Sequence, residues 1–424
     1  SPRLLCHARF YATIQRQQQQ QQQQQNDKKK LRVVFFGTDD FAVKHLKALI
    51  TDKGKPNSCI ESIDLVCPPD RKTGRKLNTI TPSPTKGIAE LYGIPVHHTP
   101  ENAKTLDGWK LPDNRDGYDL GVVVSFGYFV PSDIIHGLKK GAINVHPSLL
   151  PKYRGAAPIQ HTILAGDDKT GVTVQELDDK EFDAGRILAQ ETLDISGIEA
   201  PNYKDLKERL SSVGSRLLMD TLHNIDELKK NAKVQDLSQV TSAPKIKKEW
   251  SEVVFEDMEA WQIEQLYRAI GEQYPLRTVF TFTRIKRSKK IKQRHITMQL
   301  LNMYLPSDSP LYYMREEPEP GTFMYDDETK ALHIYCADGV AVAVTHIKAE
   351  GSNAISARDF NNGYEIRDQT GQFGYFTEED IKPGMSGVRV IKRREEYNKT
   401  IRRRMKMRKH EFEELYGKKA GRGR

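Results

Sequence analysis

The stretch NVHPSLLPKYRGAAPIQ, residues 144–160, holds an asparagine and a histidine two positions apart. The imidazole of His146 can accept and return a proton near neutral pH, and the amide of Asn144 can donate to a developing oxyanion. A carboxylate that orients the imidazole would complete an acyl-transfer site. The segment DDKEFDAGRIL offers Asp183, with Asp178, Asp179 and Glu181 as competitors that spacing alone does not exclude. On residue types alone, a histidine in a turn is more often a hydrogen-bonded structural residue than a catalytic base. The position of His146 in the fold therefore has to decide between the two roles.

The surrounding elements predict where this stretch lies. Val33–Phe36 is a short apolar strand, and residues 40–50 have the apolar spacing of a helix. The alternation recurs through SIDLVC, SPTKGIAELYGI, YDLGVVVSFG and GAINVHPS, which predicts an α/β domain with a doubly wound, mostly parallel, Rossmann-like sheet. Ligands bind beyond the carboxyl ends of such strands, where residues 37–38, 125–127 and 144–146 lie. Gly37 belongs to no GxGxxG pattern, so a nicotinamide cofactor is disfavoured.

A second domain is expected after residue 250. The spacing in residues 201–231 predicts one long amphipathic helix, with an apolar stripe of Leu206, Leu210, Val213, Leu217, Leu218 and Leu222. One further helix precedes strand-like runs, with Ala337–Gly339 as a hairpin turn, so we expect a smaller C-terminal β-barrel of OB-like form. The predicted organisation is a presequence and glutamine tract at 1–30, a catalytic domain at 31–231, a polar linker at 232–250, the barrel at 251–391 and a basic tail at 392–424.

Composition and charge narrow the class of protein. The chain has 424 residues and a net charge of +9, with no apolar run long enough to span a membrane. The basic excess lies at the ends, since residues 392–424 hold 14 basic and 5 acidic side chains and residues 1–30 hold 6 and 1. Basic ends of this kind favour contact with polyanions. The scattered cysteines, Cys6, Cys59, Cys67 and Cys336, predict buried thiols, a reducing compartment and no metal site.

Several segments, all in one order, resemble the methionyl-tRNA formyltransferase family. They are FFGTDDFAVKHLKAL, PPDRKTGRK with PSPTKGIAELYGIPV, VVVSFGYFVP, GAINVHPSLLPKYRGAAPIQHTILAGDDKTGVTVQELD and FDAGRIL, and they cover residues 31–193. Residues 243–364 are similar to that family's C-terminal barrel-like domain, more weakly. The resemblance implies transfer of a formyl group from 10-formyltetrahydrofolate to the α-amine of methionine esterified to initiator tRNA.

The resemblance also implies residue roles. Asn144, His146 and Asp183 match the catalytic triad, in which the carboxylate favours the imidazolium. The segments that match folate contacts are Gly127, Tyr128, Phe129 and Val130, together with Ser148, Leu149, Leu150 and Pro151. Arg154 is left open, either as an anchor of its loop or as a substrate contact.

Basic segments predict the tRNA surface. Arg71, Lys72, Arg75 and Lys76 form a run that would otherwise be a solvated loop, and the resemblance places it at the acceptor stem. Lys247 and Lys248 would line the groove between the domains. Seven Lys and Arg residues between 283 and 296 predict a basic excursion from the barrel that adds salt-sensitive affinity. The tail at 392–424 extends beyond the family's usual end, and contact with nucleic acid or the mitochondrial ribosome is one role for it.

The N-terminal region predicts the compartment. Arg3, Arg9 and Arg16, without an acidic residue among them, are typical of a mitochondrial presequence, and residues 17–25 are a glutamine tract. We therefore expect a monomer in the mitochondrial matrix, with no membrane association. Two other functions stay open: another folate-dependent N-formyltransferase or 10-formyltetrahydrofolate hydrolase with the same triad, and a non-catalytic mitochondrial RNA-binding protein. The C-terminal domain and the basic segments argue against the first, and the retained triad argues against the second.

Overall fold

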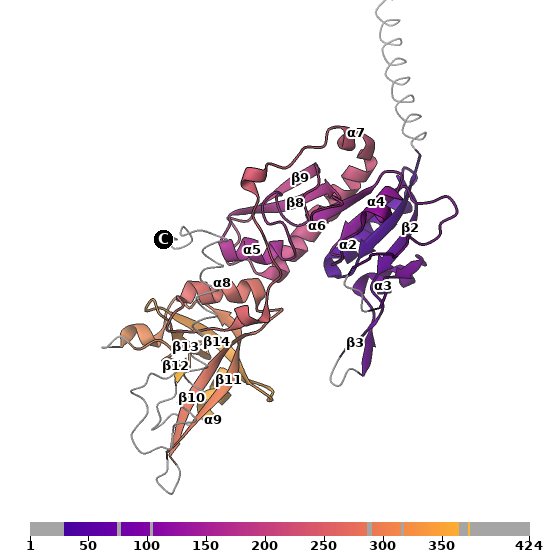
Figure 1. Cartoon of the computed structure of the whole chain (residues 1–424). Helices are drawn as coiled ribbons and strands as arrows, with labels where there is room; N and C mark the ends of the chain where they lie inside the picture. The colour runs from indigo at the N-terminus through magenta and orange to yellow at the C-terminus, as the bar shows by residue number, and fades with distance from the viewer. Residues whose placement is uncertain are drawn as a thin grey trace, which may run out of the picture. The chain divides into compact units, whose positions relative to one another are not determined.

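The computed structural model describes residues 29–73, 78–101, 105–285, 291–314, 318–363 and 372–373. The described residues divide into two compact units (Figure 1). The first comprises residues up to 158, 168–195 and 207–243, and the second comprises residues 159–167, 196–206 and 244 onward. The predicted presequence, the glutamine tract, Arg75, Lys76 and the tail at 392–424 lie outside the described residues.

The first unit is built on a sheet of seven strands among the described residues, in the order β5-β2-β1-β6-β7-β8-β9 (Figure 1). Its strands are β1 (Leu31–Gly37), β2 (Ile60–Cys67), β5 (Val96–His98), β6 (Leu120–Val124), β7 (Ala142–His146), β8 (Lys169–Glu176) and β9 (Ile187–Asp194). The first five strands in this order run parallel, and β8 and β9 are antiparallel to their neighbours. The predicted α/β domain with a mostly parallel sheet is therefore confirmed.

Helices flank these strands, and α2 and α3 begin at a side-chain cap. They are α2 (Asp40–Lys53), α3 (Pro84–Leu91), α4 (Ser132–His136), α6 (Tyr203–His223) and α7 (Ile225–Lys230). Asp39 caps α2 by accepting from the Ala42 amide at 3.0 Å, and Ser83 caps α3 just before Pro84. In the predicted stripe of α6 the five leucines are buried and Val213 is half-buried, as an amphipathic helix requires.

Strand β1 is the centre of this unit. All seven of its residues are buried, as expected for a strand with parallel neighbours on both sides and both faces covered. Its Val34 and Phe36 join a buried cluster that includes Val66, Val123 and Phe126. A Cβ on Gly37 would lie 2.6 Å from a ring atom of Phe35, so only glycine fits the turn into α2. The carboxyl ends of β1, β6 and β7 thus lie side by side at one edge of the sheet.

A separate hairpin carries the first predicted tRNA contacts. It consists of β3 (Arg71–Thr73) and β4 (Thr79–Thr81), which pair antiparallel (Figure 1). Arg71 lies opposite Thr81 and Lys72 opposite Ile80, and all four residues are exposed. This hairpin forms its own two-stranded sheet, which pairs with no strand of the large sheet among the described residues.

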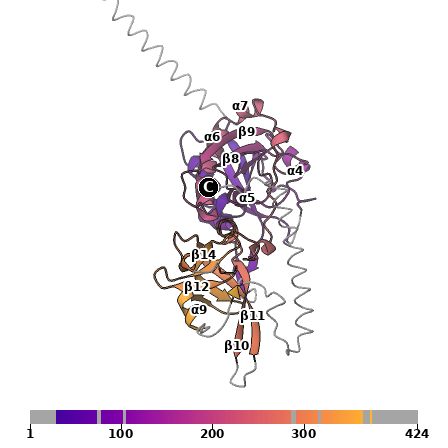
Figure 2. The same cartoon turned by 90° about the vertical axis from the view of Figure 1, so that its left-hand side faces the viewer.

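The second unit is dominated by an antiparallel sheet. Its elements are α5 (Pro158–Ala165), η3 (Lys248–Ser251), α8 (Ala260–Ile270), β10 (Leu276–Ile285), β11 (Ile291–Tyr304), η4 (Pro310–Tyr313), β12 (Phe323–Asp326), β13 (Ala331–Tyr335), β14 (Ala341–Ala349), β15 (Ala354–Ser356), α9 (Ala357–Gly363) and β16 (Gln372–Phe373). The strand order is β12-β13-β14-β11-β10-β16, with β15 beside β14. The long hairpin of β10 and β11 stands out in Figures 1 and 2. Residues 286–290 of the predicted basic excursion lie outside the described residues. Gly339, with φ of +76°, lies in the turn between β13 and β14, so the predicted hairpin is confirmed.

The segment 232–250, predicted as a linker, is divided between the two units after Ala243. Its first part pairs with the first unit, since Lys233 forms an isolated bridge with Ile187 and Ser242 forms one with Arg154. The short helix η2 (Leu237–Gln239) also lies in this part. Backbone hydrogen bonds therefore hold residues 232–243 in place, although few of their side chains are buried.

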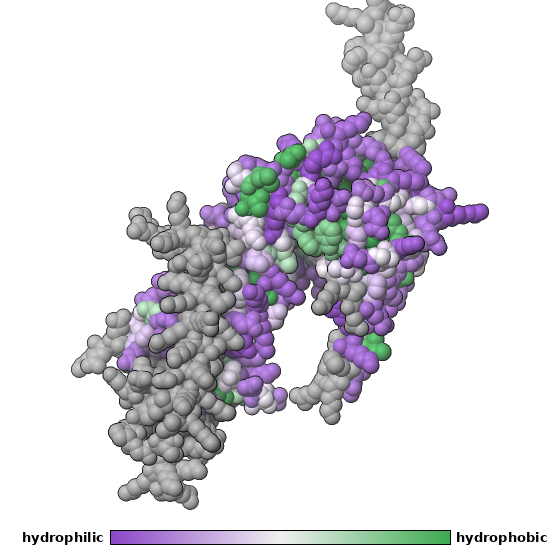
Figure 3. All heavy atoms as spheres, in the orientation of Figure 1, coloured by the Kyte–Doolittle hydropathy of each residue, from purple (hydrophilic) through white to green (hydrophobic). Residues whose placement is uncertain are grey.

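The visible surface is largely polar. Among the described residues on the face in Figure 3, hydrophobic atoms form small separate patches within a mostly hydrophilic surface. In the part of the chain that the structure describes, no helix combines the length and the apolar character that crossing a membrane requires.

Candidate active site

Strand β7 carries two of the predicted catalytic side chains to the edge where the parallel strands end. Asn144 and His146 are two residues apart on a strand, so their side chains leave the same face of the sheet. Asn144 lies opposite Val123 of β6 and Gln175 of β8. His146 is 5% exposed and Asn144 is half-buried. The sheet alone therefore brings these two side chains together.

Asp183 reaches this pair from the loop between β8 and β9. Its Oδ1 accepts a hydrogen bond from Asn144 Nδ2 at 3.1 Å and lies 3.5 Å from His146 Nδ1. The same oxygen accepts from Gln175 Nε2 at 3.0 Å, and Oδ2 accepts from the Gly155 amide at 2.9 Å. An ionised carboxylate, which only accepts, matches this set of donors. The three residues of the predicted triad thus converge on one another.

The second ring nitrogen of His146, Nε2, lies 2.9 Å from the carbonyl oxygen of Tyr153. Both ring nitrogens therefore face acceptors, so an imidazolium at this position can donate in both directions. A cation held there can stabilise negative charge that develops beside Asn144. Tyr153 has φ of +64°, which is rare outside glycine and marks a sharp bend in the loop that carries this carbonyl.

The other carboxylates that compete for the role of Asp183 are engaged elsewhere. Asp178 accepts two backbone N–H groups within its own turn, at 2.8 and 2.9 Å. Asp179 accepts from the hydroxyl of Ser132 at 3.0 Å, and Glu181 pairs with an arginine at 3.2 Å. Of the four candidates, Asp183 is the one that lies beside the imidazole, a choice that sequence spacing did not make.

The segment Ser148–Pro151, predicted to contact folate, is a tightly bonded loop. Ser148 is fully buried and its hydroxyl donates to the Lys152 carbonyl at 2.6 Å. The amide of Leu150 donates to the Thr173 hydroxyl at 3.1 Å, and the peptide bond before Pro151 is cis. The half-buried residues of the segment are Leu149 and Pro151. A ligand at this loop would therefore meet those two side chains or the backbone, and the folate contact stays a prediction.

The segment Gly127–Val130, the other predicted folate contact, follows β6. Gly127 has φ of +81°, so it occupies a conformation that favours glycine. Val130 is buried, and the Tyr128 ring packs 5.2 Å from the Phe126 ring. The Phe129 ring contacts Phe182 edge to face, with 5.0 Å between centroids. The loop after β6 thus touches the loop that carries Asp183, and both lie at the edge of the sheet where His146 ends β7.

The predicted tRNA contacts fall in separate parts of the molecule. Arg71 and Lys72 are exposed on the β3–β4 hairpin of the first unit. Lys247 and Lys248 are exposed at the start of η3 in the second unit. The role of all of them in binding tRNA stays a prediction.

Sequence reasoning did not single out two glutamines that contact the site. Gln175, the next-to-last residue of β8, donates to Asp183. Gln235, from the predicted linker, donates to the carbonyls of Asp183 and Gly185, both at 2.8 Å. Arg154, left open by the sequence, bonds to Gln235 and Glu181, so in this structure it anchors the loop. No local signal distinguishes these residues, because a glutamine in a strand or in a polar segment is ordinarily a surface residue.

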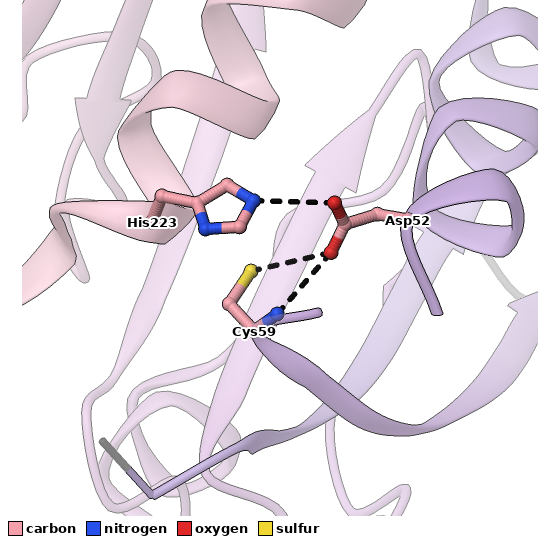
Figure 4. A group of neighbouring side chains, drawn as sticks. All are labelled: Asp52, Cys59 and His223. Carbon is pink, nitrogen blue, oxygen red and sulfur yellow. Dashed lines mark hydrogen bonds and ion pairs between the residues drawn. The ribbon is translucent and has the colours of Figure 1, made fainter. Parts of the chain in front are cut away.

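One cluster among the described residues has the side-chain types of a metal site, namely Asp52, Cys59 and His223 (Figure 4). Asp52 lies in the last turn of α2, and its Oδ1 is 3.2 Å from Nε2 of His223, which ends α6. Its other carboxylate oxygen accepts from the Cys59 amide at 3.2 Å and from Ser58 at 3.1 Å. Burial, followed by the adjacent Asp52 charge, raises the pKa of the Cys59 thiol to about 12. The printed contacts of Asp52 connect the end of α6 with the end of α2 and with residues 58–59 before β2, so in this structure the cluster ties these segments together.

Comparison with known proteins places the chain in a family. Residues 30–222 match the model of the formyl transferase family, and residues 245–365 match that of the formyl transferase C-terminal domain. The chain is 34% identical to the mitochondrial methionyl-tRNA formyltransferase of Homo sapiens over 336 residues, which cover 78% of this chain and 77% of the human one. It is also 34% identical to the enzyme of the same name from Rattus norvegicus over 339 residues, 78% of each chain. Among solved structures, HypX from Aquifex aeolicus in complex with tetrahydrofolic acid aligns with 80% of this chain and 48% of its own, at 17% identity and a TM-score of 0.48. The chain is an enzyme that transfers a formyl group, and it belongs to the methionyl-tRNA formyltransferase family.

Proposed function

We propose that the chain transfers the formyl group of 10-formyltetrahydrofolate to the α-amine of methionyl initiator tRNA in the mitochondrial matrix, using Asn144, His146 and Asp183. The observation that carries the proposal is the convergence of these three side chains at the carboxyl end of β7. The relatives named as mitochondrial methionyl-tRNA formyltransferases support the acceptor and the compartment.

The chemistry requires stabilisation of charge on one oxygen. Bound 10-formyltetrahydrofolate supplies an electrophilic formyl carbon, and the α-amine of methionine, with a pKa of about 7.7–8.0 when unperturbed, is partly neutral and nucleophilic near pH 8. As the new N–C bond forms, charge develops on the formyl oxygen. The amine then loses a proton as the bond to N10 breaks and N10 gains one. Asn144 donates to the oxygen through its second Nδ2–H, and the positive charge of protonated His146, whose two N–H groups face Asp183 and Tyr153, stabilises the same oxygen. Asp183 holds both side chains in place.

The folate fits the loops around the triad. Gly127–Val130 and the Phe182 turn present aromatic rings at this edge, and such rings suit a flat heteroaromatic ligand. Leu149 and Pro151 offer further contact surface beside them. These residues hold the formyl donor, and they supply no acid or base to the reaction.

The tRNA would be held by exposed cations. Arg71 and Lys72 are on a hairpin that extends from the first unit, and Lys247 and Lys248 are on the second unit. Arg75 and Lys76 continue the basic run of the hairpin in the sequence. Contacts of this type to phosphates are independent of base sequence and weaken as salt rises.

The decisive experiment compares acceptors. The purified full chain, supplied with 10-formyltetrahydrofolate, should formylate methionyl initiator tRNA far faster than free methionine, an amino-sugar nucleotide, glycinamide ribonucleotide or water. His146→Ala should reduce that rate by on the order of 10²–10³, since it removes the cation that stabilises the oxyanion. A preferred small-molecule acceptor would contradict the proposed substrate, and an unchanged rate in His146→Ala would contradict the proposed site.

A further inference from the structure

Three buried polar side chains form a chain of hydrogen bonds that ends on Asp183. Arg154 donates to Gln235 Oε1 from Nε at 3.0 Å and from Nη2 at 2.8 Å. Gln235 Nε2 in turn donates to Gln175 Oε1 at 3.1 Å. Gln175 Nε2 donates to Asp183 Oδ1 at 3.0 Å. Arg154, Gln235 and Gln175 are 8%, 5% and 1% exposed, so water does not easily replace these bonds.

Arg154 fixes the direction of each hydrogen bond in the series from Arg154 to Asp183. A guanidinium has only donors, so the oxygen of the Gln235 amide must face it and the NH₂ must face away. That NH₂ meets the Oε1 of Gln175, which leaves the NH₂ of Gln175 to face Asp183. The Asp183 carboxylate therefore accepts from the NH₂ of Gln175, and this amide cannot reverse without breaking its hydrogen bond to Gln235. Amide flips, which would otherwise put an oxygen against the carboxylate, are excluded.

Gln235 also holds the backbone of the turn that carries Asp183. Its Nε2 lies 2.8 Å from the carbonyl oxygen of Asp183 and 2.8 Å from that of Gly185. The two hydrogens of this NH₂ group are therefore shared among three acceptors, namely these two carbonyls and Gln175 Oε1. Asp183 has φ of +56°, a left-handed conformation that is uncommon for residues other than glycine and that the surrounding structure has to support. Gln235 thus fixes both the backbone and, through Gln175, the carboxylate of the same residue.

We infer that Gln235 is a positioning residue for formyl transfer, acting through Asp183, with Arg154 setting the direction of its amide. The inference rests on the proposed triad. It assigns a role in the reaction to the segment after α7, whose composition is that of a linker. The alternative is that Gln235 only attaches residues 232–243 to the first unit, in which case its loss would lower stability and leave the rate of the folded enzyme intact.

The first test replaces Gln235 and measures kcat and KM for both substrates. Gln235→Met removes the amide, and Gln235→Glu keeps the size and the contact with Arg154 but removes the donor. Both should lower kcat about 10- to 100-fold, the range seen when groups that orient catalytic ligands are removed, with each KM within about threefold of the parent. Gln265→Met is the matched control, because Gln265 in the second unit also donates to a backbone carbonyl at 2.8 Å. It should leave kcat unchanged.

The second test is a double-mutant cycle with Asp183→Ala. If Gln235 acts through Asp183, Gln235→Met should change the residual rate of Asp183→Ala less than about twofold. An equal loss in both backgrounds, or a parental kcat in the folded Gln235 variants, would overturn the inference. Full activity of Asp183→Ala itself would instead overturn the triad, so the two failures are distinguishable. Should Gln235→Met fail to fold, Gln235→Glu, which retains the partner of the buried guanidinium, carries the same comparisons.

Discussion

The substitution Asp183→Asn tests the carboxylate with almost no change in volume. In the structure Oδ1 faces two amide donors and the imidazole, and Oδ2 faces the Gly155 N–H. An asparagine has one acceptor oxygen and one NH₂ group, so no orientation satisfies both sides. The less costly orientation keeps the oxygen at the Oδ1 position and turns the NH₂ toward Gly155. We therefore expect the loss of one hydrogen bond to a charged acceptor, about 1.5–3 kcal/mol of unfolding free energy.

The effect on catalysis should be larger than the effect on stability. The asparagine carries no charge, so the imidazolium of His146 loses its ionic partner at 3.5 Å. Because that cation and Asn144 stabilise the developing oxyanion, kcat/KM should fall by on the order of 10²–10³, the range found for loss of an oxyanion donor. Initial rates of tRNA formylation give the kinetic loss, and urea denaturation gives the stability loss on the same preparation.

Asp179→Asn is the matched control for this prediction. Asp179 lies in the same loop and accepts from Ser132, remote from the imidazole. Its substitution should leave the rate within about threefold of the parent, as is usual for changes away from the reacting groups. A kcat/KM for Asp183→Asn within threefold of the parent, in a variant that folds, would refute the view that this carboxylate orients and charges His146.

Three further substitutions test other parts of the reasoning. Gly185→Ala would put a Cβ 1.7 Å from the Glu176 carbonyl oxygen, so it should lower the unfolding free energy by about 1–3 kcal/mol. Gly197→Ala is the control, because a Cβ at Gly197 would meet open space and should change the unfolding free energy little. Equal losses in the two variants would contradict the packing argument. Burial lowers the pKa of His45 from 6.5 to about 4, so the unfolded chain takes up the proton first and stability falls as pH drops from 6.5 toward 4. The loss of unfolding free energy should reach about 2 kcal/mol at pH 5, and this loss should be smaller in His45→Leu. The same pH dependence of urea unfolding in the parent and in His45→Leu would contradict the prediction. Arg71→Glu should weaken tRNA binding and reduce its salt slope by about one, and identical binding isotherms across salt concentrations would remove that residue from the tRNA surface.

Much of the fold could be predicted from the sequence because its signals are local. The fully apolar run of β1, the cap at Asp39 and the Ser83-Pro84 start of α3 each depend on residues within a few positions. The stripe of α6 is visible from spacing alone, and its leucines are buried. The end of α6 at His223 was not visible, since the polar spacing continues through α7.

The same distinction between local signals and long-range contacts holds for the candidate site. The sequence by itself determined that Asn144 and His146 share one face at the end of a strand, because a period of two residues is a property of the strand. Only the tertiary structure decided which carboxylate meets the imidazole and that Gln235 lies behind it. Those contacts join residues 37 and 52 positions apart, and their geometry depends on the path of the intervening loops. Polar composition made residues 232–250 resemble a linker, because hydrogen bonding to distant partners, unlike apolar burial, produces no periodic pattern along the chain.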